Sequence, residues 1–103
     1  MAIDVGIWTG DVVTHGDVDS WADASHVVAP EMYDDEKTFP LLSGIDPYGN
    51  TIFNQVQIPR FITELERRLE AFDPGPRRRS VERVLALARD CRGAHKYLVF
   101  VGD

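Results

Sequence analysis

The sequence predicts a small α+β fold in which a two-helix hairpin packs on one face of a sheet of three or four strands. Three observations predict it. An alternating apolar segment opens the chain, two segments with helical periodicity occupy its second half, and an apolar segment closes it. The 103 residues are enough for one domain and too few for two, so we expect a single domain over residues 1–103.

The first part of the chain predicts one strand followed by mostly polar connections. Residues 3–8 alternate, with isoleucine and valine on one side, as in a strand with one buried face. Residues 10–26 mix glycines and aspartates with two histidines, which predicts a long loop or an irregular hairpin. Residues 26–29 predict a short strand that ends at the next proline, and the acidic residues 31–37 predict a solvated run.

The segment 46–57 (DPYGNTIFNQVQ) contains two consecutive turn signals and then a short extended piece over 51–54. Within residues 48–57, six neutral side chains can form hydrogen bonds: Tyr48, Asn50, Thr51, Asn54, Gln55 and Gln57. Two interpretations stay open: these groups close turns and cap the next helix, or they present a neutral surface with one aromatic ring, Tyr48, to another protein.

Two helices should follow as a hairpin. Pro59 suits a first helical turn, and apolar residues then recur at spacings of three and four as far as Phe72. The sequence Asp-Pro-Gly-Pro at 73–76 ends this helix. Ser80 is expected to cap the second helix, whose apolar stripe runs through residues 81–91.

The last apolar segment, residues 97–101 (YLVFV), has no polar side. A central strand that is covered on both faces needs this composition, and so does a strand at an interface. Both positions stay open at this stage.

The charge distribution indicates the class of partner. A net charge of −6 and a pI near 4.9 argue against unassisted binding to nucleic acid or to an anionic membrane. Residues 1–59 hold ten acids and one base, whereas residues 60–103 hold seven acids and ten bases. We therefore expect an acidic face beside a mildly basic one.

The cysteine content indicates a compartment. Cys91 is the one cysteine, so no intramolecular disulfide can form, and neither a signal peptide nor a long apolar stretch appears in the sequence. The expected location is the cytoplasm.

No motif predicts catalysis or a cofactor. A group of possible metal ligands lies within residues 10–26, but its spacing matches no known ligand loop, and a solvated acidic loop is the favoured interpretation. The group consists of His15, Asp17 and Asp19 with Asp11, Asp23 and His26 nearby. Cys91 lies on an apolar stripe, where a buried inert thiol is usual, and no orienting group accompanies it. We predict that the protein is no enzyme and has no metal site, while a metal at residues 10–26 stays an open question.

The basic cluster at residues 77–79 could grip a phosphate or an acidic partner. A solvated turn is preferred, because runs of charge usually lie on exposed faces.

The segment 46–57, the helix after it and the closing residues 95–103 resemble short uncharacterised bacterial cytosolic proteins. Some small acidic proteins of this build are similar to immunity proteins. The resemblance covers about the last 60 residues, and it implies a protein that neutralises a cognate toxin by binding it. It assigns no catalytic residue.

The predicted function is therefore that of a protein-binding module, an immunity protein or similar inhibitor whose acidic half docks on a basic partner such as a toxin. Carboxylates would steer association, and aromatic side chains would supply the buried anchors. The predicted contact residues are Trp8, Asp17, Asp19, Trp21, Tyr33, Asp34, Asp35, Glu36, Tyr48 and Asn50.

Two alternatives remain. The chain could be a structural or regulatory subunit that pairs through its apolar C-terminal strand, including pairing as a homodimer. It could also be a small enzyme that uses the region of His15 and His26, although no triad or metal pattern accompanies these residues.

Overall fold

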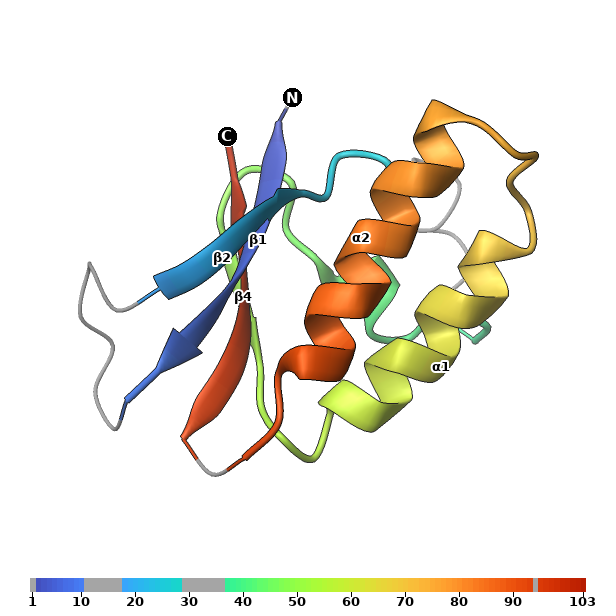
Figure 1. The fold of residues 1–103 in the computed structure, drawn as a ribbon. Coiled ribbons are helices and arrows are strands. Elements are labelled where there is room, and N and C mark those ends of the chain that lie inside the picture. The colour runs from blue at the N-terminus through green and yellow to red at the C-terminus, as the bar shows by residue number, and fades with distance from the viewer. Residues whose placement is uncertain (1, 11–17, 29–36, 94) are drawn as a thin grey trace.

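The chain forms two layers, a four-stranded antiparallel sheet and a helical hairpin that covers one of its faces (Figure 1). A computed structural model describes residues 2–10, 18–28, 37–93 and 95–103. The α+β arrangement predicted from the sequence is confirmed. The strands are β1 (Ile3–Thr9), β2 (Val18–Asp23), β3 (Asn50–Phe53) and β4 (Lys96–Gly102), the helices are α1 (Ile58–Leu69) and α2 (Pro76–Asp90), and a short 3-10 turn, η2, spans Leu42–Gly44.

The strand β4 lies in the middle of the sheet, whose order is β2-β1-β4-β3. It pairs with β1 along its whole length, from Ile3 opposite Gly102 to Thr9 opposite Lys96. Its other edge pairs with β3. The strand is thus central, and neither of its edges is left for pairing with another chain. The expectation that a central strand of this composition is covered on both faces is not met, because Val101 is exposed on the side away from the helices.

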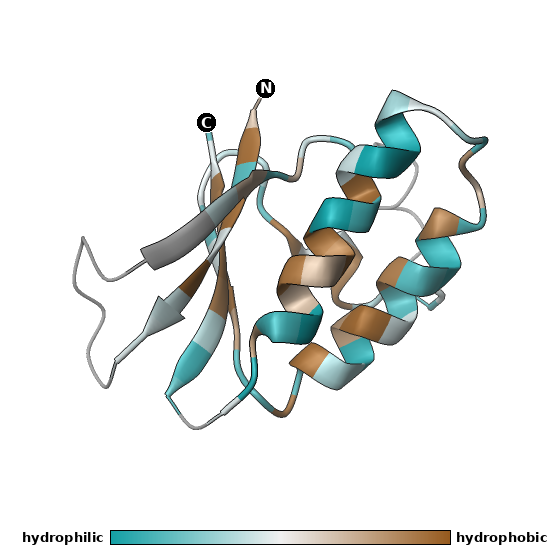
Figure 2. Cartoon of the chain, viewed as in Figure 1, coloured by the Kyte–Doolittle hydropathy of each residue, from teal (hydrophilic) through white to brown (hydrophobic). Residues whose placement is uncertain are grey.

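The core lies between the sheet and the helices. From β1, Ile3 and Val5 are fully buried, and from β4 so are Leu98 and Phe100. The Phe100 ring lies 5.5 Å from that of Phe61 in α1, between centroids. Figure 2 shows the corresponding apolar stretches on β1, β4 and the inner sides of both helices. Alternation along β1 therefore sends one set of side chains to the helices and the other set away from them.

The hairpin of β1 and β2 is irregular, as the composition of residues 10–26 suggested. Val5 pairs with Ala22 and Ile7 with Asp19, so the register shifts between these two pairs. The extra residue of this bulge lies in β2, opposite Gly6.

The second helix begins earlier than the sequence predicted. Pro76 occupies its first turn, where the missing N–H costs nothing. Ser80 lies inside the helix, where its Oγ donates to the Pro76 carbonyl, so the prediction that it caps the helix is wrong. Arg78 joins the hairpin, because its Nη1 donates at 2.9 Å to the carbonyls of both Leu69 and Phe72 at the end of α1.

The short strand predicted at residues 26–29 does not form over its described part. Residues 25–27 make a turn, in which the Val27 N–H donates to the Ala24 carbonyl. Val27 and Val28 are buried in the core, so their apolar character reflects packing and not sheet pairing. The predicted acidic run lies outside the described residues except for Lys37, which is exposed.

The polar segment 46–57 serves the fold at its helical end. The Asn54 side chain accepts from the N–H of Gln57, and the Gln57 side chain accepts from the N–H of Asn54. This reciprocal pair has the pattern of a capping box and closes the turn just before α1, whose N-cap residue, Gln57, makes no side-chain cap hydrogen bond. Gln55 Nε2 donates to the carbonyls of Cys91 and Lys96, which ties the α2–β4 connection to the start of α1.

Glu64 holds η2 against α1. The residue is only 5% exposed, and its Oε1 accepts from the N–H groups of Leu41 and Leu42 at 2.9 and 3.1 Å. A buried carboxylate is stable only when such donors replace water. Glu64 therefore serves as a structural hydrogen-bond acceptor, although a charged residue outside the apolar stripe of a helix is usually exposed to solvent.

We expect Glu64→Ala to lower the free energy of unfolding by about 2 to 4 kcal/mol, because two N–H groups lose a charged acceptor in a buried site. Glu66→Ala is the matched control. Glu66 is half exposed in an ion pair with Arg89, so its loss should cost less than about 1 kcal/mol. Urea unfolding measures both, and equal losses would contradict the structural role of Glu64.

Candidate functional site

The strongest candidate site is the face of the sheet that points away from α1 and α2. No helix among the described residues covers it (Figure 1). We call it the open face and define it by the residues that strand register and alternation place there: Asp4, Gly6, Trp8, Trp21, Asp23, Asn50, Ile52, Tyr97, Val99, Val101 and Asp103.

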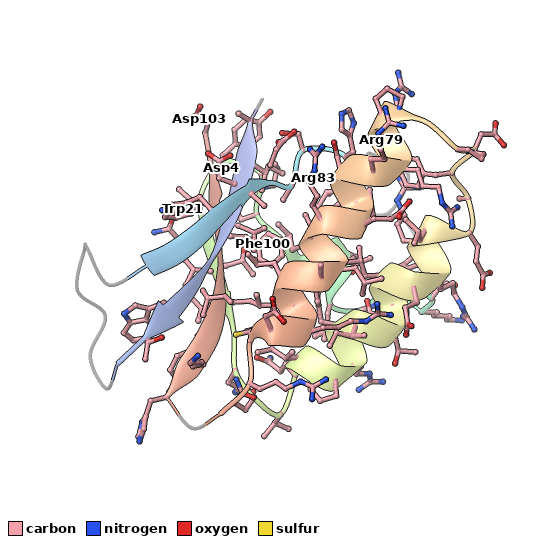
Figure 3. All side chains as sticks on the ribbon, viewed as in Figure 1. Asp4, Trp21, Arg79, Arg83, Phe100 and Asp103 are labelled. Carbon is pink, nitrogen blue, oxygen red and sulfur yellow. The ribbon has the colours of Figure 1, made fainter. Side chains whose placement is uncertain are left out.

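The middle of the open face is apolar and exposed. Val99 lies between Gly6 of β1 and Ile52 of β3, and Val101 is the next β4 residue on this side. Trp21 is 53% exposed, Ile52 41% and Val101 36%. In Figure 3 Trp21 projects away from the helices, whereas Phe100 points between the layers. A sheet face of this composition that borders water is typical of an interaction surface.

One end of the open face is acidic. Asp4 pairs with Asp23 across β1 and β2, and Asp103 continues beside them, where its N–H donates to the Ala2 carbonyl. All three side chains are exposed. The residues that define the open face include no lysine, arginine or histidine, and like charges that face each other across two strands are unfavourable. His26, in the turn after β2, lies near enough to Asp23 to interact with it electrostatically.

Asp23 is held in its charged form. Its Oδ1 accepts from the Ser25 hydroxyl at 2.6 Å and from the Ser25 N–H at 3.0 Å. The hydroxyl hydrogen bond is the largest cause of a lowered pKa at Asp23, and it outweighs the slight burial that acts in the opposite direction. The acidic end therefore keeps this negative charge well below neutral pH.

Trp8 forms the floor at the other end of the open face. Its ring packs on Tyr97 with centroids 4.9 Å apart, and only 4% of the residue is exposed. Its Nε1 is buried and has no hydrogen-bond partner among the described residues. Trp8 is therefore buried in this protein, and little of its ring is exposed for contact with a partner, unlike Trp21.

Four of the other predicted contact residues are described by the structure, and two of them lie on the open face. Trp21 and Asn50 lie on the open face, at β2 and at β3. Tyr48, which is 74% exposed, belongs to the turn before β3, where Asp46 Oδ1 accepts from its N–H. Asp19 pairs with Ile7 in β2. Asp17, Tyr33, Asp34, Asp35 and Glu36 lie outside the described residues.

Sequence reasoning missed Asp4, Asp23, Ile52 and Val101 as members of one surface. The alternation that assigns Ile3, Val5 and Ile7 to the core also assigns Asp4 to the opposite side, so the signal for Asp4 was present. Asp23 joins it only through the register of a bulged hairpin, which sequence does not specify.

Within the part of the chain that the structure describes, the fold brings no further metal-binding or catalytic side chains next to those that the metal-site and enzyme hypotheses named. Among the described residues, no cluster of three or more histidine, cysteine, aspartate or glutamate side chains could hold a metal ion. His15 lies outside these residues, and His26 lies in the turn after β2. Cys91 is 1% exposed, and its main-chain carbonyl accepts from Gln55 at the end of α2. No helix in the described parts of the chain is long and apolar enough to cross a membrane.

Comparison with known proteins found no match to a family model, to a curated protein or to a solved structure.

Burial raises the pKa of the Cys91 thiol, although nearby Lys96 and a hydrogen bond with Gln55 act weakly in the opposite direction. We expect a thiol reagent such as DTNB to react on the order of a hundredfold more slowly with the native protein than with the protein in urea. The neutral, buried thiol also contributes to the free energy of unfolding. Because the pKa of Cys91 is higher in the folded state than in the unfolded state, this contribution is complete below the ordinary pKa of 9.0 and is lost as pH rises through the folded-state pKa.

Reaction of Cys91 at the same rate in both states would contradict its burial. The variant Cys91→Ala is the control for the stability measurement. Its free energy of unfolding should fall less than that of the wild type as the pH rises above 9.0, because it has no thiol to ionise.

Proposed function

We propose that this chain is a protein-binding module that docks a basic protein on its open face. The observation that carries the proposal is the combination of exposed Trp21, Ile52 and Val101 with Asp4 and Asp23 on one sheet surface that bears no described cation. Exposed apolar side chains supply the free energy of burial, and carboxylates at their edge select a partner of positive charge.

The partner's charge follows from what the open face lacks. Asp4 and Asp23 are directly opposed, so a cationic side chain placed between them relieves their repulsion as well as forming new ion pairs. Trp21 is two residues from Asp23 on the same side of β2. An indole face beside two carboxylates suits an arginine or lysine, because the ring attracts the cation and the carboxylates pair with it.

The described carboxylates of the first half of the chain remain available for such a partner. Both ion pairs that the described residues form, Arg78 with Glu82 and Arg89 with Glu66, lie in the helical layer. In that layer α2 alone has five arginines against two acids. The arginines of the chain therefore do not neutralise Asp4 and Asp23, and acidic sheet and basic helices stay on separate sides.

An immunity protein or similar inhibitor is the specific function we propose within this class. Enzymes that act on nucleic acid carry basic clefts, and an exposed acidic surface with aromatic anchors competes for such a cleft while it speeds association. The negative net charge of −6 supports the same proposal.

The test isolates partners on the immobilised protein and then measures the affinity of each purified partner by calorimetry at low and high salt. We expect Trp21→Ala to weaken binding by at least about tenfold, as for an interface hot spot. Asp4→Lys should weaken it further at low salt and reduce its salt dependence. Arg79→Ala, on the exposed surface of α2, is the control and should change affinity by less than about twofold.

Thermal unfolding shows whether these variants stay folded, which we expect because Trp21 and Asp4 are exposed. If a purified partner binds wild type, Trp21→Ala and Asp4→Lys equally at low salt, the open face is not its docking site and the proposal fails.

The subunit alternative makes a different prediction. Both edges of β4 are occupied within the sheet, so a second copy cannot pair along this strand. The exposed apolar side chains of the open face are then the surface through which we would expect self-association. Like charges at Asp4, Asp23 and Asp103 oppose that in a second copy, and we expect sedimentation to show a monomer at tens of micromolar. A stable dimer that Trp21→Ala dissociates would instead favour the subunit.

A further inference from the structure

A second surface, on the helical layer, has the opposite charge and its own cavity. The cavity measures about 250 Å³ and lies between the outer side of α1 and the residues just before η2. Its walls include Lys37, Arg60, Thr63, Glu64 and Arg67, and we call it the basic pocket.

Three cations converge on the basic pocket. Arg60 and Arg67 are seven positions apart and so lie on the same side of α1, while Lys37 comes from the chain before η2. None of these three side chains forms an ion pair or a hydrogen bond with another described residue. Like charges gathered without partners are unfavourable, and an anion between them would remove that cost.

Among the described residues that line the basic pocket, Glu64 is the one carboxylate, and it is already engaged in hydrogen bonds. Glu64 accepts from the N–H of Leu41 through both of its oxygens and from the N–H of Leu42 through Oε1. It is 95% buried by its neighbours, since only 5% of the residue is exposed. With Glu64 counted, the described residues that line the pocket still carry an excess of positive charge.

We propose that the basic pocket binds the dianionic phosphoryl group of a small phosphate monoester. Two guanidinium groups present paired N–H donors that match the oxygens of a phosphoryl group, and the lysine ammonium adds a third positive contact. A carboxylate ligand would use fewer of these donors. The volume of about 250 Å³ is below that of most drug-sized sites, so it accommodates a phosphoryl group with a small organic part.

This site is independent of the proposed function. The basic pocket lies on α1 and the segment before η2, whereas the open face lies on the other side of the sheet. Figure 3 shows the same separation of charge, with Asp4 and Asp103 on the sheet and Arg79 and Arg83 on α2. Loss of phosphate binding would leave docking on the open face unaffected, and the reverse also holds.

The experiment titrates the whole protein with inorganic phosphate, and separately with phenyl phosphate, at constant ionic strength. ¹H–¹⁵N NMR spectra monitor each titration. We expect saturable shifts at the amide of Thr63, which lines the basic pocket, and at the amides of Leu41 and Leu42, which donate to its wall residue Glu64. Arg60→Gln and Arg67→Gln should each weaken binding by about tenfold or more, since each removes charge-assisted hydrogen bonds.

Arg79→Gln is the matched control, because it removes the same charge from an exposed arginine on α2 and should leave the affinity within about twofold. Arg60 and Arg67 are exposed, so their variants should keep the wild-type melting temperature. The proposal is overturned if the shifts do not saturate, if sodium chloride produces the same shifts, or if Arg79→Gln weakens binding as much as Arg60→Gln does. Binding of inorganic phosphate without phenyl phosphate would overturn the assignment to a monoester.

Discussion

The pairing of β4 on both of its edges is the constraint on which the rest of the structure depends. Since β1 occupies one edge and β3 the other, alternate β4 residues must point to opposite sides of the same sheet. Leu98 and Phe100 enter the core, while Val99 and Val101 emerge on the open face. The composition that makes β4 a good central strand therefore also leaves apolar side chains on the side that no described helix covers.

Local patterns predicted β1, β4 and the two helices because each of these elements has its own periodic or apolar signal. Two examples are the alternation of residues 3–8 and the apolar stripe of α1, since each pattern can be recognised within a short stretch of sequence. By contrast, β2 lies in a segment that showed only the composition of a loop or irregular hairpin. Predictions were wrong where two local signals compete: Pro76 and Ser80 both mark helix starts, and Pro76 prevails. At residues 26–29 apolar character was taken for a strand, but Val27 is buried by tertiary packing.

The candidate site was less predictable, because its members come together through pairing between distant segments. Asp4 meets Asp23 through a bulged register, and Ile52 reaches Val99 through the β3–β4 pair. Sequence treated Trp8 and Trp21 as equivalent, yet Trp8 packs under Tyr97 and Trp21 projects into solvent. The likeness of two aromatic residues in sequence says little about exposure when one stacks on a neighbouring strand.

The order of the strands also bears on how the chain reaches its native state. The two central strands are the first and the last elements in sequence, with Ile3 opposite Gly102. Their ladder can form only after almost the entire polypeptide has been brought into a closed loop, at a high cost in chain entropy. Such non-local topology slows folding, so α1 and α2 can pair early while the middle of the sheet is completed late.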